Sequence, residues 1–460
     1  MPTGLTPAGA ACAATSDDIA AVAMRPPGIG NLGISPAEGT LGGAGRKRDR
    51  SHGTATTGPQ LRDRKLRSIR HNAFMPNPFL SGSPVRGDHF GDREDEVRWL
   101  VRRMGDGQNV FVMSPRRYGK SSLLIRAAEQ ARGNGVRVGI ANLMRCSTRR
   151  QVAEELLHGV VDGALGWRQG TAEQVKKRIA RLPGVKPQLE HEGWTYALEL
   201  TRSETSFIEE IRRPIKLLAD SASRGHPVCL ILDEFQQIAD IDETLAGEFK
   251  AMTDDLPEVS LVFAGSRRHL MERLFVGATA PLQNAADPLA LAVIPEPKMV
   301  AFLYDRSAAG GREMTEEAAH AIYQLVRGIP HFVQLLAAAA WDREANPIDL
   351  PVVKRGLVDV LVTQRGNLAD RFEGLTTVQR KFIQTLAGMP TRQVDSKAFL
   401  EAADLAKSSA QRAREQLEDL EHIIWDDRMG WRLQDPIFER YLIHGRPLEV
   451  GEEINPDTIA

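Results

Sequence analysis

The stretch that constrains the fold most is residues 110–124, which read V-F-V-M-S-P-R-R-Y-G-K-S-S-L-L. An apolar run with strand character ends in a short loop closed by Gly119, Lys120 and Ser121, and an apolar pattern with helical spacing follows. This order is typical of the phosphate-binding loop G-x-x-x-x-G-K-[ST], here with Ser114 in place of the first glycine. An ordinary strand–turn–helix is the less specific interpretation.

The residue types in this loop suit a nucleoside triphosphate. Successive backbone N–H groups curl around phosphates, and the helix N-terminus adds partial positive charge. We expect Lys120 to reach the β- and γ-phosphates and the Ser121 hydroxyl to ligate Mg²⁺. The predicted nucleotide-binding residues of the loop are Ser114, Pro115, Arg116, Arg117, Tyr118, Gly119, Lys120, Ser121 and Ser122.

A second stretch, residues 227–238, reads P-V-C-L-I-L-D-E-F-Q-Q-I. A continuous apolar strand brings Asp233 and Glu234 to its carboxyl end, where open parallel sheets bind their ligands. Asp233 is suited to holding Mg²⁺, and Glu234 to polarising an attacking water. A further apolar strand, residues 259–264, is followed by Ser266, which is placed to touch the γ-phosphate or the water. An acidic turn and a turn serine are the alternative interpretations.

Composition sets the broad class of the protein. The 460 residues contain 59 Lys+Arg and 60 Asp+Glu, so the net charge of -1 does not by itself indicate nucleic acid or a membrane surface as partner. The three cysteines lack metal or disulfide spacing, as is typical of a reducing compartment. No apolar run is long enough for a transmembrane helix. We therefore expect a cytoplasmic protein without a membrane partner.

Hydrophobic periodicity divides the chain. Residues 1–74, rich in Ala, Gly, Thr, Pro and Arg, are expected to be a disordered or non-native extension, with a true start near Met75. Strands alternating with helices over residues 75–295 predict a parallel α/β sheet. Residues 296–370 show helical periodicity throughout, and residues 371–446 read as three helices and a hairpin. The predicted fold is an α/β P-loop NTPase core, an all-α lid, a winged helix and a tail at residues 447–460.

Several motifs together resemble one family. Residues 77–79 read N-P-F and residues 90–96 read F-G-D-R-E-D-E. The loop at residues 114–123 reads S-P-R-R-Y-G-K-S-S-L, residues 233–236 read D-E-F-Q, and residues 265–266 read G-S. This combination resembles the AAA+/STAND-type P-loop ATPases, in the bacterial and archaeal branch related to origin-recognition ATPases. The resemblance covers about residues 77–445.

The resemblance implies further site residues and a mode of action. Phe90 and Arg93 are expected near the adenine, and Pro330 is expected to face the base or ribose. Residues 281–285 lack the arginine that relatives often carry, and His331 occupies the position of the usual lid arginine. The arginines that remain as candidate γ-phosphate contacts, in cis or in trans, are Arg267, Arg268 and Arg273. Loss of an arginine finger slows turnover on the order of 10³-fold or more, so slow, switch-like hydrolysis is expected.

The predicted winged helix leaves two roles open. Gln411, Arg412 and Arg414 lie in the recognition position, with both arginines expected to point away from the apolar face toward a phosphate backbone. Acidic residues crowd the same helix and the wing tip, which disfavours DNA and favours a structural or protein-contacting role. These are Glu415, Glu418, Asp419, Glu421, Asp426 and Asp427.

The leading hypothesis is an ATP-binding, Mg²⁺-dependent ATPase that acts as a molecular switch, with Lys120, Glu234 and Ser266 as catalytic residues and Ser121 and Asp233 as metal ligands. One alternative is a DNA-binding winged-helix protein of replication, transposition or transcription with nucleotide as a structural ligand. Another is an oligomerising STAND-type signalling or defence ATPase. The partners expected are ATP, an unidentified protein, DNA through the winged helix and a nucleotide-dependent homo-oligomer.

Overall fold

The computed structural model describes residues 76–80, 82, 84–85, 91, 93–165, 185–190, 193–198, 205–222, 225–443 and 456–459. The expectations for residues 1–74, for Met75 and for Phe90 lie outside these ranges. Contacts divide the chain into two units, Met1–Arg70 and His71–Ala460, and the second unit contains all the described residues. No helix within the described ranges has the length and apolar character that crossing a membrane requires.

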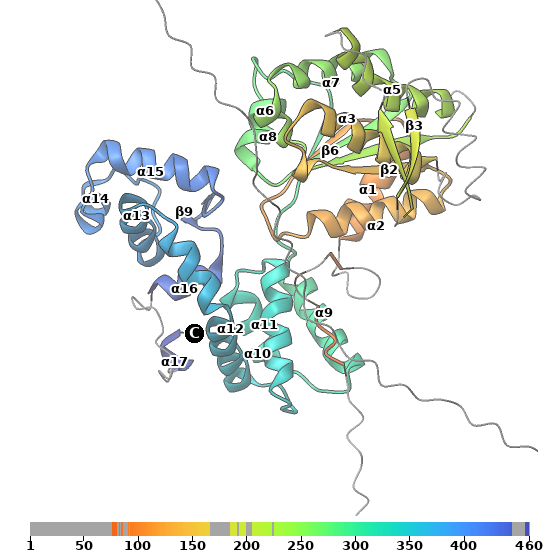
Figure 1. Cartoon of the computed structure of the whole chain (residues 1–460). Coiled ribbons are helices and arrows are strands. Elements are labelled where there is room, and N and C mark those ends of the chain that lie inside the picture. Colours follow the sequence, from red (N-terminus) through yellow and green to blue (C-terminus); the bar gives the residue numbers. More distant parts are fainter. Residues whose placement is uncertain are drawn as a thin grey trace, which may run out of the picture. The chain divides into compact units, whose positions relative to one another are not determined.

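Five parallel strands form the central sheet, in the order β2-β5-β6-β1-β7. Every residue of β5 and β6 is buried, because helices cover both faces of the sheet (Figure 1). The predicted parallel α/β sheet is therefore confirmed, whereas β7 was not expected from the sequence. The strands are β1 (Val110–Met113), β2 (Arg137–Asn142), β5 (Val228–Asp233), β6 (Val259–Gly265) and β7 (Asp287–Ala290).

Successive side chains of the strands point to opposite faces of the sheet, and each face has its own hydrophobic core. Helices α1 and α2 cover one core, which takes Val112 from β1, and α1 buries the apolar residues of its inner face in this core. Helices α3, α5 and α7 cover the other core, which takes Phe111. The helices of this region are α1 (Glu94–Gly105), α2 (Lys120–Gly133), α3 (Arg149–His158), α5 (Thr205–Ala222), α6 (Gln237–Ile241), α7 (Thr244–Asp255) and α8 (Arg268–Phe275).

Two short segments and a hairpin complete the α/β region. A 3₁₀ turn, η2 (Leu143–Arg145), follows β2, and a π-helical segment, η3 (Gly159–Ala164), continues α3. Strands β3 (Val185–Glu190) and β4 (Gly193–Leu198) pair antiparallel, apart from the central sheet.

The next region is all-helical, as the periodicity predicts. Helices α11 and α12 pack so closely that a Cβ atom added at Gly356 would lie 2.9 Å from the backbone nitrogen of Ala340. The alanine run at residues 337–340 therefore serves close helix packing. The helices are α9 (Glu296–Ala309), α10 (Glu316–Leu325), α11 (Pro330–Asp342) and α12 (Leu350–Glu373).

The C-terminal region contains three helices followed by an antiparallel hairpin, the element order of a winged helix. Thr376 and Gln379 form a reciprocal capping box at the first of these helices. Among the described residues, two further helices follow the hairpin, and neither was expected. The elements are α13 (Thr377–Gly388), α14 (Lys397–Ala403), α15 (Lys407–Asp419), β8 (Ile423–Asp426), β9 (Gly430–Leu433), α16 (Pro436–Ile443) and α17 (Pro456–Ile459).

Candidate functional site

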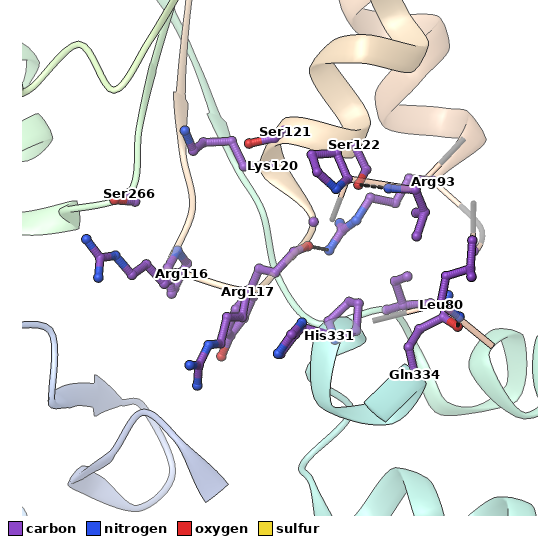
Figure 2. Close-up of a pocket in the computed structure, with 18 of the residues that line it drawn as sticks. Leu80, Arg93, Arg116, Arg117, Lys120, Ser121, Ser122, Ser266, His331 and Gln334 are labelled. Atoms are coloured by element: carbon purple, nitrogen blue, oxygen red, sulfur yellow. Dashed lines mark hydrogen bonds between the residues drawn. The ribbon is translucent and has the colours of Figure 1, made fainter. Parts of the chain in front are cut away.

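A cavity of about 580 Å³ lies at the carboxyl ends of β1 and β5 and extends to helices α9 and α11 (Figure 2). A volume of this size suits a mononucleotide, since ligand pockets commonly measure roughly 300–1,000 Å³. One end is polar and includes Lys120, Ser121, Glu234 and Ser266. The other end is largely apolar and is lined by Leu80, Val85, Ile294, Met299, Phe302 and Pro330.

The loop between β1 and α2 has the geometry of an anion cradle. Gly119 is the N-cap residue of α2 and adopts a left-handed backbone (φ 89°), with no side chain capping the helix. The first N–H groups of α2 thus have no side-chain cap, and such groups favour negative charge. A residue with a Cβ atom would be strained at this φ, which accounts for glycine here.

The acidic tip of β5 lies against Lys120, as the two motifs predict. The Nζ atom of Lys120 contacts Asp233 Oδ1 and lies 2.8 Å from Glu234 Oε1. The three side chains are 7%, 10% and 13% exposed, so the charges compensate one another away from solvent. The Ser121 hydroxyl donates a hydrogen bond of 3.4 Å to Asp233 Oδ2. Hydroxyl and carboxylate oxygens are ligands that Mg²⁺ accepts, so this pair of residues fits a bound magnesium ion.

Glu234 is held by three donors. Ser266 Oγ and Gln236 Nε2 donate to its Oε2 atom at 3.0 Å and 2.6 Å, while Lys120 approaches Oε1. Burial alone would raise the pKa of Glu234, but the Lys120 charge and these hydrogen bonds outweigh burial and bring the pKa below its usual value. Glu234 is therefore ionised at neutral pH.

Arg93 lines the cavity, and its guanidinium is committed to the protein. Its Nη2 atom donates to the backbone oxygens of Tyr118 at 2.9 Å and Ala292 at 2.7 Å, and Nη1 pairs with Glu96 at 3.0 Å. The side chain thus ties the phosphate-loop backbone to the segment after β7. Phe90, its expected companion near the adenine, lies outside the described residues.

The two loop arginines extend toward the C-terminal region (Figure 2). Arg116 Nε lies 2.6 Å from Oε2 of Glu421, which lies between α15 and β8. Arg117 contacts the carboxylate of Asp435, immediately before α16, and its guanidinium carbon lies 4.7 Å from the ring centre of Phe332. Their side chains therefore join the loop to a region more than 300 residues away, while both residues also line the cavity.

The remaining predicted residues divide into two groups. Ser114 is fully buried with its backbone nitrogen 3.3 Å from the oxygen of Gly265. It lies outside the lining of the cavity, whereas Pro115, Tyr118, Ser122 and Pro330 belong to that lining. Arg267 and Arg268 line a neighbouring cavity of about 240 Å³. They pair with Asp240 at 3.3 Å and Glu272 at 2.8 Å, respectively.

The expectation that Arg414 points away from the packed face is wrong. Its guanidinium carbon lies 5.0 Å from the ring centre of Trp431 in the hairpin, and it pairs with Glu418 at 2.9 Å and Glu415 at 3.0 Å. Asp419, at the end of the same helix, lies 2.9 Å from His269 of α8. Arg412 and Gln411 are exposed.

The sequence did not predict the network of Asp435, Arg371 and His422 with which Arg117 pairs. Asp435 is 4% exposed and pairs with Arg117 and, at 2.8 Å, with Arg371. Arg371 Nε donates to His422 Nδ1 at 3.0 Å. The sequence does carry one signal, because an Asp–Pro pair directly before an apolar helical pattern is typical of a helix start. Nothing in that signal identifies the partner of the carboxylate.

We expect this network to make stability depend on pH. Burial and the charge of Arg371 lower the pKa of His422 to about 4, and burial and Arg117 lower that of His331 to about 4, although Asp435 opposes both shifts. Because the unfolded chain binds more protons between these values and the ordinary pKa, stability falls as pH drops from about 7 to 4, by roughly 2–3 kcal/mol for each histidine.

Thermal unfolding monitored between pH 7.5 and 4.5 tests this expectation. The melting temperature should fall with pH, and His422→Gln should flatten the decline because the substituted amide does not titrate. An equal decline in both proteins would show that His422 is not responsible.

Comparison with known proteins addresses the fold. No protein-family model and no curated protein sequence matches the chain. Among solved structures, it is similar to a Walker-type ATPase of Pyrococcus abyssi, with 16% identity, a TM-score of 0.57, and coverage of 79% of this chain and 99% of the other.

Two more distant structures also match. One is the Orc1 protein of Aeropyrum pernix in complex with DNA, with 13% identity, a TM-score of 0.44, and coverage of 78% of this chain and 94% of the other. The other is the RuvB Holliday junction branch migration motor of Thermotoga maritima, with 15% identity, a TM-score of 0.38, and coverage of 75% and 93%. The sheet order and the Pyrococcus match together show that the chain has the α/β fold of P-loop NTPases.

Proposed function

We propose that this protein is a Mg²⁺-dependent ATPase that hydrolyses ATP slowly and acts as a nucleotide-controlled switch. The observation that carries the proposal is the meeting of Lys120, Ser121 and Glu234 at the polar end of a nucleotide-sized cavity, with Asp233 in contact with Lys120 and Ser121. A strand–turn–helix without a ligand gains nothing by burying a lysine beside two carboxylates, since such pairs cost desolvation.

The residues divide the work of phosphoryl transfer. Lys120 exchanges its carboxylate partners for the β- and γ-phosphates, and the N-terminus of α2 binds the phosphate oxygens. Ser121 and Asp233 hold the metal site, and a bound Mg²⁺ supplies charge neutralisation on the transferring phosphoryl group. Glu234 orients the attacking water, with Ser266 beside it. The apolar end, with Phe302 and Pro330, takes the adenine.

The arrangement of arginines supports slow turnover. Among the described residues that line the larger cavity, the arginines are Arg93, Arg116 and Arg117. Each guanidinium binds a carboxylate. An arginine that is free to stabilise the transition state raises turnover by roughly 10³–10⁵-fold. Because the arginines of this site are paired with carboxylates, we expect slow hydrolysis, as in a switch.

Switching is supported by the contacts between the phosphate loop and the C-terminal region. Arg116 and Arg117 adjoin the phosphate-binding turn and contact Glu421 and Asp435. Nucleotide phosphates and these carboxylates are both negative, so they compete for the same positive charges. We propose that this competition changes the position of the C-terminal region relative to the phosphate loop. A cytoplasmic protein partner, or a second copy of the chain, would bind one of the two arrangements in preference to the other. DNA binding through α15 has weaker support, because Arg414 is engaged in ion pairs and Asp419 contacts α8.

Glu234→Gln should retain ATP binding and slow hydrolysis by about 10²-fold, the usual scale for lost acid–base assistance. The amide preserves the size of the side chain but does not take up a proton from water. Steady-state phosphate release measures the rate, and titration calorimetry with ATP and Mg²⁺ measures binding. Glu258→Gln, at an exposed position before β6, is the matched control. Wild-type turnover in Glu234→Gln would remove Glu234 from the mechanism.

A further inference from the structure

A buried amide lies directly behind Glu234. Gln236 is 3% exposed, and its Nε2 atom donates to Glu234 Oε2 over 2.6 Å. Its Oε1 atom is buried and has no hydrogen-bond partner among the described residues. A buried amide that satisfies one end and leaves the other unsatisfied is unfavourable for stability, so the single bond to Glu234 calls for an explanation.

The orientation of this amide is fixed by its surroundings. If the oxygen and nitrogen of this amide were exchanged, the amide oxygen would lie 2.6 Å from Oε2 of the ionised Glu234, which is strongly repulsive. The space for the amide oxygen comes from Gly265, where an added Cβ atom would lie 2.5 Å from Gln236 Oε1. The end of β6 is thus shaped to accept this side chain.

The two carboxylate oxygens of Glu234 have different partners. Oε2 accepts from Gln236 and Ser266, neither of which is charged. Oε1 accepts from Lys120, the residue that the proposed function moves onto phosphate. When Lys120 leaves, Oε1 alone becomes free to accept a hydrogen bond, while Oε2 stays fixed. Glu234 itself adopts a left-handed backbone (φ 55°), which is uncommon for a residue with a Cβ atom.

We propose that Gln236 is a positioning residue for ATP hydrolysis, which fixes Oε2 of Glu234 so that Oε1 faces the attacking water. This inference rests on the proposed ATPase function. It goes beyond that function because Gln236 touches neither nucleotide nor water and acts only through Glu234.

Gln236→Met tests the proposal, since methionine has a similar length but no N–H donor. We expect kcat to fall about 10- to 100-fold, the scale seen when partners behind a metal ligand are lost, with little change in KM. The acid limb of the pH–rate profile should move to higher pH, because a lost donor raises the pKa of the carboxylate it served.

Gln236→Glu gives a second readout with the opposite response to pH. At neutral pH its carboxylate would repel Glu234, and hydrolysis should be slow. As pH falls, the two carboxyl groups share a proton, and a protonated Glu at this position can donate as the amide does. The activity of this variant relative to wild type should therefore rise toward lower pH. A residue that only fills space would not produce this recovery.

The background Glu234→Gln separates positioning from packing. There, Gln236→Met should cause no further loss of kcat, whereas damaged packing would slow hydrolysis equally in both backgrounds. Melting temperatures of all variants establish that they are folded. Wild-type rates and an unshifted pH profile in Gln236→Met, or equal losses in both backgrounds, overturn the inference alone. If calorimetry finds no ATP binding by the wild-type protein, the proposed function fails, and this inference fails with it.

Discussion

Lys120→Ala should weaken ATP binding by about 100-fold or more. The lysine is expected to make charge-assisted hydrogen bonds to two phosphates, each worth roughly 1.5–3 kcal/mol, and tenfold in affinity corresponds to about 1.4 kcal/mol. Lys120 is the first residue of α2 and lines the cavity, so its Nζ atom lies near the helix N-terminus, where anions bind favourably. Titration calorimetry with ATP and Mg²⁺ measures the loss directly.

The same substitution should also lower stability in the absence of nucleotide. Lys120 pairs with both Asp233 and Glu234, and all three side chains are largely buried. Removal of one member of a buried ion pair leaves uncompensated charge and costs roughly 3–5 kcal/mol. Denaturant unfolding of Lys120→Ala measures this cost. A partly unfolded protein would lose ATP binding whether or not Lys120 contacts the phosphates. A second variant that keeps the positive charge is therefore required.

Lys120→Arg is that second variant. Arginine keeps the positive charge beside Asp233 and Glu234, so most of the stability should return. Its larger planar head does not place a point charge between two phosphates, so ATP binding should stay weak. If Lys120→Ala is folded and binds ATP as wild type does, the cavity does not bind a triphosphate through this loop.

Local motifs made the sheet and the polar end of the site predictable. A phosphate loop follows one buried strand and an acidic pair follows another, and parallel strands bring their carboxyl ends to one edge. Strand β7 was missed because its sequence D-P-L-A is short and contains a proline, which weakens the strand signal and suits an edge position. Helix α6, with only five residues, is too short to show periodicity.

Long-range partners were beyond the reach of the motifs. Arg117 reads as a phosphate contact when only its neighbours are considered, and its bond to Asp435 spans 318 positions in the sequence. Gln236 was noted only as the last residue of the motif D-E-F-Q, and its proposed role depends on which way the amide faces. Both cases concern the direction of a polar side chain, which periodicity and spacing do not determine.

Asp435→Asn should destabilise the protein by roughly 1.5–3 kcal/mol, because it leaves Arg117 and Arg371, whose side chains are 42% and 24% exposed, without their shared carboxylate. The substitution removes the negative charge of Asp435 but keeps the oxygen that caps α16. Oδ1 of Asp435 accepts from the backbone nitrogens of Ile437 at 2.9 Å and Phe438 at 3.0 Å, and asparagine caps helices about as well as aspartate. The loss therefore reports the ion pairs. Asp427→Asn, at an exposed position in the turn between β8 and β9, is the matched control and should change stability by less than about 0.5 kcal/mol.

The pair Arg117→Gln and Asp435→Asn then shows whether the phosphate loop and the C-terminal region are energetically coupled. If the two residues stabilise each other, the double variant loses less stability than the sum of the single losses, by about 0.5–3 kcal/mol. Additive losses would mean that the contact is incidental. Coupling would also set the direction of the proposed switch. A ligand that competes for the charge of Arg117 weakens the bond to Asp435, and that bond opposes binding of the ligand by the same free energy.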